Sequence, residues 1–285
     1  MGKMHLPFSK LVRMACPDLA KKGGLAVALF KAYVDESTDT GNVLFVVGGF
    51  VAPESVWDSL EGEWPSALPP YCRYFHSTEC FAGSGQFDGV DASEREGVLH
   101  RLTDILARKE MWLIAYGLRA ETYRKLAPKP RANRFWGNRY VGLFSGVVEA
   151  ACWCANSPIP PHPTGETSGT CVFFIEKSDY SGGARKALQG MRADPSLWWR
   201  RSIGAETFGS KEGPAAIPLL QVADLGAFLA AKKLGQSPDR RVPWKQFYDK
   251  LGGAGRIFKV VRVTDDELRV FHRQFLDDPG VSPGC

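Results

Sequence analysis

The longest apolar runs in the chain predict buried β-strands near the start. Residues 43–51 read VLFVVGGFV, an almost unbroken apolar run of the kind found in strands covered on both faces. Residues 26–35 form a second such stretch, and the segment between them, 37–42 (STDTGN), has the composition of a turn. Because so short a turn joins them, the two strands are expected to pair as an antiparallel hairpin.

Helical and strand patterns alternate through the rest of the chain, after the leading hairpin. This order predicts an α/β protein with a mixed β-sheet flanked by helices. We divide the chain into an N-terminal appendage (1–25), one domain (26–256), and a C-terminal helix and tail (257–285). Helices are expected at 53–64, 92–109, 136–155, 182–191, 218–234 and 265–276, and strands at 71–76, 111–118, 171–176 and 202–208.

Composition narrows the class of protein without naming a function. No run approaches the ~18 to 20 apolar residues of a membrane-spanning helix, so no membrane partner is expected. The seven cysteines are odd in number and scattered, unlike the dense framework of a small secreted domain, and a reducing, cytoplasmic location is therefore expected. A net charge of +5 is too small to indicate nucleic-acid binding by itself.

Three acidic residues stand at positions where a charge is costly. Asp35 closes the first apolar strand, Glu176 closes the strand CVFFIE, and Asp224 lies in a helix that is apolar almost all round. Taken singly, each can be a strand-end or capping residue. Brought together, three carboxylates repel one another unless a cation neutralises them, and Mg²⁺ or Mn²⁺ favours such oxygen ligands. The set therefore predicts a divalent-metal site, and such sites can hydrolyse phosphodiesters.

Three further residues are candidates for supporting roles. Glu36 follows Asp35, and because successive strand side chains alternate in direction, it is expected either behind the site or on the surface. Asp179 either supports the site or caps the helix that follows it. His76 is a candidate general acid or base or metal ligand, and equally a hydrogen-bonded structural histidine.

The segment 124–139 is the strongest nucleic-acid signal in the sequence. It contains six basic residues and no acid, and aromatic residues are interleaved with them. Basic side chains contact phosphates and aromatic rings stack on bases, so the two together suit a nucleic-acid strand. The alternative is a solvated loop and helix start. The candidate contacts are Arg131, Arg134, Trp136 and Arg139.

Three motifs in order resemble one known family. The string YVDESTDTGNVLFVVGGFVAP resembles the opening of domain-of-unknown-function family 3800 of bacteria and phages, usually Y-x-D-E-S-G-D-x-G, with Thr38 in place of Gly. Phe75-His76 before a glycine-containing loop, and residues 221–225 (QVADL), are similar to its later motifs. The resemblance covers about residues 30–235. It implies an RNase H-like fold, a predicted nuclease activity, and an acidic site containing Asp35 and Asp224, with Glu176 where Asp is more usual.

These observations predict a divalent-metal-dependent nuclease that acts on RNA or DNA, with Asp35, Glu176 and Asp224 as ligands of Mg²⁺ or Mn²⁺. The resemblance adds a defence or mobile-element context. The alternative is a catalytically silent RNase H-like module that binds nucleic acid or a partner protein, and Thr38 and Glu176 favour it. A protein partner or a homo-oligomer is open under either hypothesis.

Overall fold

The computed structural model describes residues 29–38, 43–126, 139–156, 169–213, 215–235 and 244–264. Several sequence predictions fall elsewhere. The appendage at 1–25 and the helix at 265–276 lie outside the described residues, as do Arg131, Arg134 and Trp136. Arg139 begins a helix, but its side chain is not among those described.

In the described part of the chain, six strands form one mixed sheet in the order β5-β4-β1-β2-β3-β6. Strand β2 is antiparallel to β1 and to β3, and the remaining neighbours are parallel. The β1–β2 pairing confirms the predicted hairpin. The sheet confirms the α/β prediction and is compatible with an RNase H-like fold. The strands are β1 Leu29–Thr38, β2 Leu44–Pro53, β3 Trp112–Arg119, β4 Thr170–Glu176, β5 Ile203–Gly209 and β6 Ile257–Arg262.

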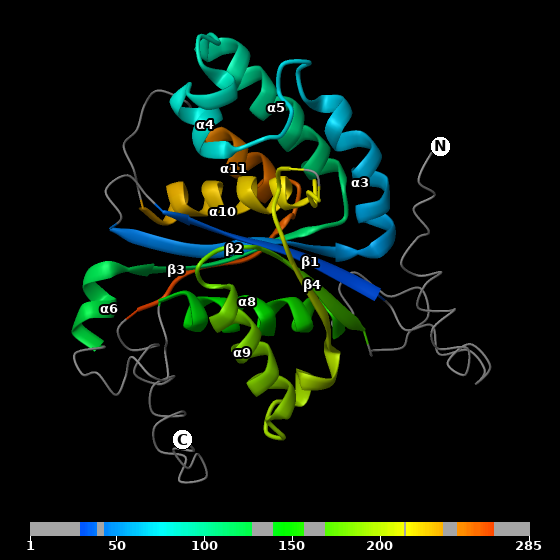
Figure 1. Ribbon diagram of the computed structural model, residues 1–285, viewed down its shortest axis with the longest axis vertical. Coiled ribbons are helices and arrows are strands. Elements are labelled where there is room, and N and C mark those ends of the chain that lie inside the picture. The colour runs from blue at the N-terminus through cyan, green and yellow to red at the C-terminus, as the bar shows by residue number, and fades with distance from the viewer. Residues whose placement is uncertain are drawn as a thin grey trace, which may run out of the picture.

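Helices cover both faces of the sheet (Figure 1). One face carries α3 (Glu54–Ala67), α4 (Ser77–Ala82), α5 (Ala92–Arg108), α10 (Leu220–Gly235) and α11 (Trp244–Gly253). The other carries α8 (Arg139–Asn156) and α9 (Ser181–Ala193). Helix α6 (Ala120–Leu126) follows β3, and the short 3₁₀ segments are η1 (Gly85–Phe87) and η2 (Trp198–Ser202). No helix within these described ranges has the length and apolar character needed to cross a membrane.

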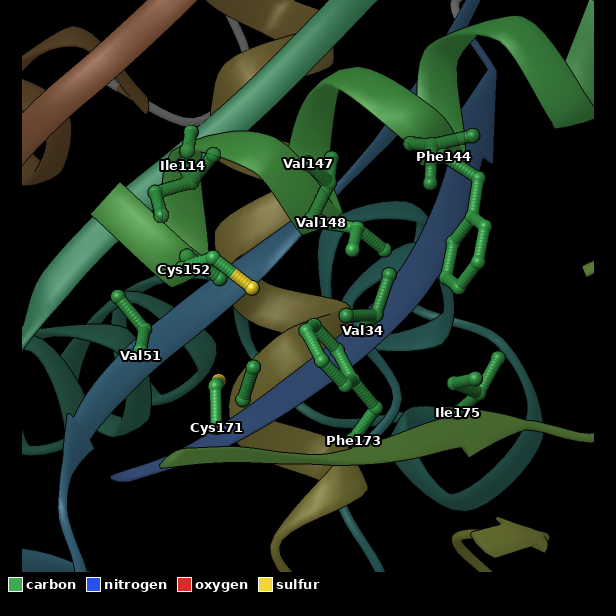
Figure 2. Packing of buried hydrophobic residues seen from close by; sticks show 14 of the residues in the cluster. Val34, Val51, Ile114, Phe144, Val147, Val148, Cys152, Cys171, Phe173 and Ile175 are labelled. Carbon is green, nitrogen blue, oxygen red and sulfur yellow. The ribbon is translucent and has the colours of Figure 1, made fainter. Parts of the chain in front are cut away.

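Alternation along β1 divides the apolar core into two layers. Its even positions, such as Val34, pack with Phe173 and Ile175 of β4 against α8 (Figure 2). Its odd positions, such as Tyr33, face the other layer, where α10 lies. Residues 220–232 are buried without interruption, which explains why this helix is apolar all round.

Helix α10 lies close to the sheet because of a glycine in the middle of it. A Cβ atom at Gly226 would stand 2.8 Å from the ring of Phe50 on β2 and 2.9 Å from Leu113 on β3. Hydrogen in place of a side chain therefore lets the helix backbone approach both strands. This contact brings the start of α10 beside the ends of β1 and β4.

The predicted strand at 71–76 and the predicted end of the domain at residue 256 do not agree with the structure. Residues 71–76 do not form a strand but run through turns, and the Phe75 N–H donates to the side chain of Gln221 on α10 (2.8 Å) instead of to a strand. The aromatic pattern there reflects core packing, because Phe75 is fully buried beside Trp64. The sheet also extends past residue 256, since β6 pairs with β3. As a partly exposed edge strand, β6 lacks a continuous apolar run.

Candidate functional site

Strand alternation places Asp35 and Glu176 side by side. Strands β1 and β4 are parallel, and the last residues in register are Val34 and Ile175. Tyr33 and Phe174 stack on the face of the sheet that α10 covers, with ring centroids 4.6 Å apart. Because side chains two residues apart on a strand share a face, the acids that follow, Asp35 and Glu176, also face α10. Beyond this point β1 continues along β2 to Thr38, so Asp35 does not end the strand as predicted.

The third acid, Asp224, reaches the same point from α10. It is buried, and its Oδ2 accepts a hydrogen bond from the Ser77 N–H at the start of α4 (2.6 Å). One turn earlier on the helix, Gln221 Oε1 accepts from Trp64 Nε1 (3.1 Å) and from the Phe75 N–H (2.8 Å). Two polar side chains in an apolar helix therefore hold the segment around His76 against the site.

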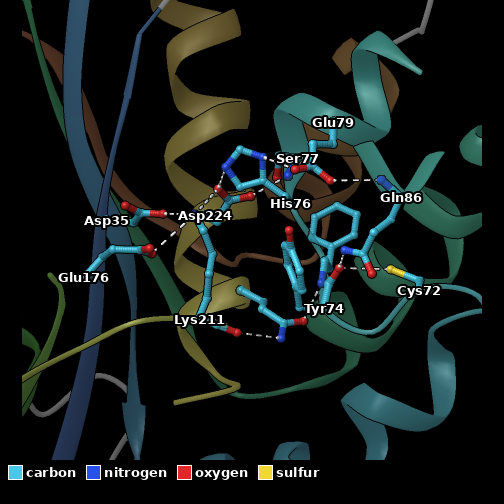
Figure 3. A network of polar contacts seen from close by, with 12 residues as sticks. Asp35, Cys72, Tyr74, His76, Ser77, Glu79, Gln86, Glu176, Lys211 and Asp224 are labelled. Carbon is cyan, nitrogen blue, oxygen red and sulfur yellow. Dashed lines mark hydrogen bonds and ion pairs between the residues drawn. The ribbon is translucent and has the colours of Figure 1, made fainter. Parts of the chain in front are cut away.

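A lysine that the sequence analysis did not single out lies among the three acids. Lys211 comes from the connection between β5 and α10, and its Nζ is 2.7 Å from Asp224 Oδ1. The same atom is 3.1 Å from Asp35 Oδ2 and 3.3 Å from Glu176 Oε2 (Figure 3). The structure thus brings the three predicted acids together around one cationic atom.

Charge at this point is unbalanced, because three carboxylates meet one ammonium group. Burial raises the pKa of Asp35 well above its usual value, Lys211 opposes the rise, and the neighbouring acids add to it. Burial likewise raises the pKa of Glu176. Burial lowers the pKa of Lys211, but the surrounding carboxylates more than reverse this, so its pKa is raised and the lysine stays charged. The site therefore keeps a tendency to take up protons or a further cation.

His76 lies at the edge of the acidic cluster. Its Nε2 is 3.6 Å from Asp224 Oδ1 and its Nδ1 is 4.0 Å from Glu79 Oε1. About a third of its side chain is exposed (30%), so a ligand can approach it. Gly85 packs against the Glu79 carboxylate, and its φ of +57° is a left-handed conformation that suits glycine. The imidazole is therefore within reach of two acids and of solvent.

The short helix α4, which begins after His76 and carries Glu79, is held by an arginine from α5. Arg95 Nη1 donates to the carbonyl groups of Cys80 and Phe81, 2.9 Å in each case, at the end of α4. The chain then turns at Gly83 with φ +68°, a left-handed conformation that suits glycine. This arrangement fixes a short helix whose first residue contacts Asp224.

The other two predicted supporting residues lie apart from the cluster. Glu36 points to the opposite face, as strand alternation predicts, where it hydrogen-bonds Ser178 and burial raises its pKa to about 7. Asp179 is exposed, and it neither joins the three acids nor caps α9. The turn before α9 is closed instead by reciprocal hydrogen bonds between Ser178 and Ser181.

The donor atoms suit a hard divalent cation, although they are arranged around an ammonium group. Asp35, Glu176 and Asp224 each direct one carboxylate oxygen at Lys211 Nζ, and Mg²⁺ and Mn²⁺ favour such ligands. Over the residues that the structure describes, no three His, Cys, Asp or Glu side chains already stand at spacings that would hold a metal ion. The chemistry of the donors fits a cation, and Lys211 fills the position between them.

Comparisons of the chain with protein-family models, with curated proteins and with solved structures find no match. The resemblance to family 3800 therefore stays a prediction based on its three motifs. Two residues around the three acids were not predicted as site residues. The first, Gln221, lies in the third of those motifs, residues 221–225. Lys211 lies in SKEG, which reads as a solvated turn and carries no signal of a site.

Proposed function

We propose that the protein is a divalent-metal-dependent nuclease that hydrolyses phosphodiester bonds in RNA or DNA. Asp35, Glu176 and Asp224 hold Mg²⁺ or Mn²⁺. The observation that carries the proposal is the convergence of three carboxylates on one cation position: Asp35 of β1 and Asp224 of α10 are buried, and Glu176 of β4 is half-buried. Gathering these charges costs desolvation and mutual repulsion, and a cation that binds there relieves both.

The chemistry divides between the cation and the side chains. When bound, a divalent ion supplies charge neutralisation and water activation at the phosphodiester. The Ser77 N–H orients the Asp224 carboxylate, and the Glu36 N–H orients that of Asp35 (2.7 Å). His76 borders the cluster, with its Nε2 3.6 Å from Asp224 Oδ1, and it is the candidate general acid or base.

The test is cleavage of labelled RNA, single-stranded DNA, duplex DNA and an RNA–DNA hybrid by purified protein with Mg²⁺, Mn²⁺ or EDTA. We expect at least one substrate to be cut with metal and none with EDTA. Asp35→Asn purified in parallel is the control for contamination, because it keeps the size of the side chain and loses its charge. Equal cleavage by wild type and Asp35→Asn would contradict the proposal.

A second candidate is favoured by Lys211 itself. In a silent RNase H-like module that binds nucleic acid or a partner protein, this lysine is the permanent counter-ion of the three acids. Binding of a metal to the folded state raises thermal stability, whereas a permanent ammonium ion leaves no place for the metal. A melting temperature that does not respond to Mn²⁺, together with nucleic-acid binding without cleavage, would support the silent module.

A further inference from the structure

We infer that Lys211 is an internal counter-ion, which holds the acidic site together without metal and which a divalent cation must displace to bind. The inference rests on the proposed function, because it concerns how the metal enters. It assigns Lys211 a role in setting metal affinity. The lysine is a positioning residue here, and no step of the reaction is assigned to it.

Lys211 and a divalent cation would compete for the same carboxylate oxygens, because the other oxygens of Asp35 and Asp224 already accept hydrogen bonds. Asp35 Oδ1 already accepts the Glu36 N–H (2.7 Å), and Asp224 Oδ2 already accepts the Ser77 N–H (2.6 Å). The remaining oxygen of each faces Lys211 Nζ, at 3.1 Å and 2.7 Å. A cation held by these oxygens would need the volume that the ammonium group occupies. The metal and the lysine therefore exclude each other at this point.

The way Lys211 is attached allows its charged end to leave while its backbone stays in place. The Lys211 carbonyl accepts a hydrogen bond from Gln221 Nε2 (3.4 Å), and the Ser210 carbonyl accepts one from the Ile217 N–H (2.7 Å). These contacts hold the connection against α10. The ammonium group stands at the end of a flexible four-carbon chain, so it can move out without unfolding the connection.

A second buried lysine provides a matched control. Lys31 on β1 is as buried as Lys211, and its Nζ is 3.2 Å from Glu54 and 3.3 Å from Asp58. Both acids come from α3, and neither is a predicted ligand. Replacing Lys31 with Met removes a buried ammonium group of the same kind and leaves the candidate metal ligands unchanged.

The experiment measures Mn²⁺ affinity by isothermal titration calorimetry for wild type, Lys211→Met and Lys31→Met, without nucleic acid. We expect Lys211→Met to bind Mn²⁺ at least about tenfold more tightly than wild type, because a competing charge is gone. Lys31→Met should match wild type. Without metal, Lys211→Met should melt at a lower temperature than wild type, and Mn²⁺ should raise its melting temperature by more.

Equal or weaker Mn²⁺ binding by folded Lys211→Met would overturn the inference. If the variant does not fold without metal, it is purified in Mn²⁺ and the ion is removed with EDTA. Unfolding on removal, with Lys31→Met unaffected, supports the inference, and failure to fold in Mn²⁺ overturns it.

The result is separable from that of the proposed function. Asp35-dependent cleavage by wild type, with unchanged Mn²⁺ affinity in Lys211→Met, would leave the nuclease proposal standing and overturn this inference. Conversely, wild type that cuts no substrate would count against the nuclease proposal alone. Tight Mn²⁺ binding that appears in Lys211→Met and is lost in the Asp35→Asn/Lys211→Met double variant would still support displacement.

Discussion

Two buried lysines on the same side of the sheet are surrounded by acids, yet their surroundings differ. Lys31 pairs with two carboxylates, and the side chain of one of them, Asp58, is 52% exposed to water. Lys211 pairs with three, and no side chain in that cluster is more than 16% exposed. Water can screen the first cluster but hardly reaches the second. A buried ion pair alone therefore does not indicate a candidate site, whereas an excess of negative charge around it does.

The two clusters also differ in how the chain assembles them. Glu54 and Asp58 stand four residues apart on α3, so one helix supplies both partners of Lys31. The partners of Lys211 come from β1, β4 and α10, and the lysine from a connection. The Lys31 cluster holds one helix to one strand, whereas the Lys211 cluster exists only once the fold is complete.

The largest expected effect separates the two clusters by activity. Asp35→Asn should lower metal-dependent cleavage by at least about 100-fold, because it removes a charge that holds the cation. Glu54→Gln, the matched change beside Lys31, should stay within about threefold of wild type. The measurement is kcat/KM on the substrate that wild type cuts.

Stability should move differently from activity in the same Asp35→Asn variant. Burial raises the pKa of Asp35 in the folded state, so at neutral pH its ionised form opposes folding. The melting temperature of Asp35→Asn without metal should therefore equal or exceed that of wild type. Mn²⁺ should not raise the melting temperature of the variant further. A clear drop in the metal-free melting temperature would show that Asp35 stabilises the fold, as expected of Glu54. The Lys31 and Lys211 clusters would then not differ in this respect.

The next effect concerns the residue that holds the Lys211 cluster in place. Gln221→Leu leaves the buried Trp64 Nε1–H and Phe75 N–H without their acceptor and should cost about 2 to 3 kcal/mol of unfolding free energy. Urea denaturation measures this loss. Gln246→Leu, an exposed glutamine on α11, is the control and should be nearly neutral. A neutral Gln221→Leu would mean that α10 does not position the segment before His76.

A smaller effect tests whether nucleic acid reaches the acidic cluster. Replacing Arg134 and Arg139 with Ala should weaken binding about tenfold with little sequence dependence, and lower the salt slope by about one per lost phosphate contact. Fluorescence anisotropy over a salt series measures both, with exposed Arg108→Ala as control. Unchanged affinity and slope would identify 124–139 as an ordinary solvated segment.

The smallest expected effect is at Asp179. Its carboxylate is exposed and lies outside the group that contacts Lys211, so Asp179→Asn should leave cleavage within about twofold of wild type. A loss comparable to that of Asp35→Asn would show that the acidic site extends beyond the Lys211 cluster. The candidate site would then include residues beyond those that contact Lys211.

Hydrophobic periodicity was sufficient for much of the fold. The leading hairpin, the buried strand that ends at Glu176 and the apolar helix that carries Asp224 were all predicted. Each signal is local, because burial on one face or on all faces leaves a repeat in neighbouring residues. Where burial was irregular, as in the aromatic turn segment 71–76, or only partial, as in edge strand β6, the prediction failed.

The sequence by itself determined which acids lie in or at the end of buried elements, because an acid within an apolar run is visible without coordinates. Only the tertiary structure decided what lies between them. Lys211 sits in a polar turn with no periodic pattern, and it meets the acids because β5 and α10 bring that connection to the ends of β1 and β4. Contacts among segments far apart in the chain depend on packing, and packing leaves no local mark on a single lysine.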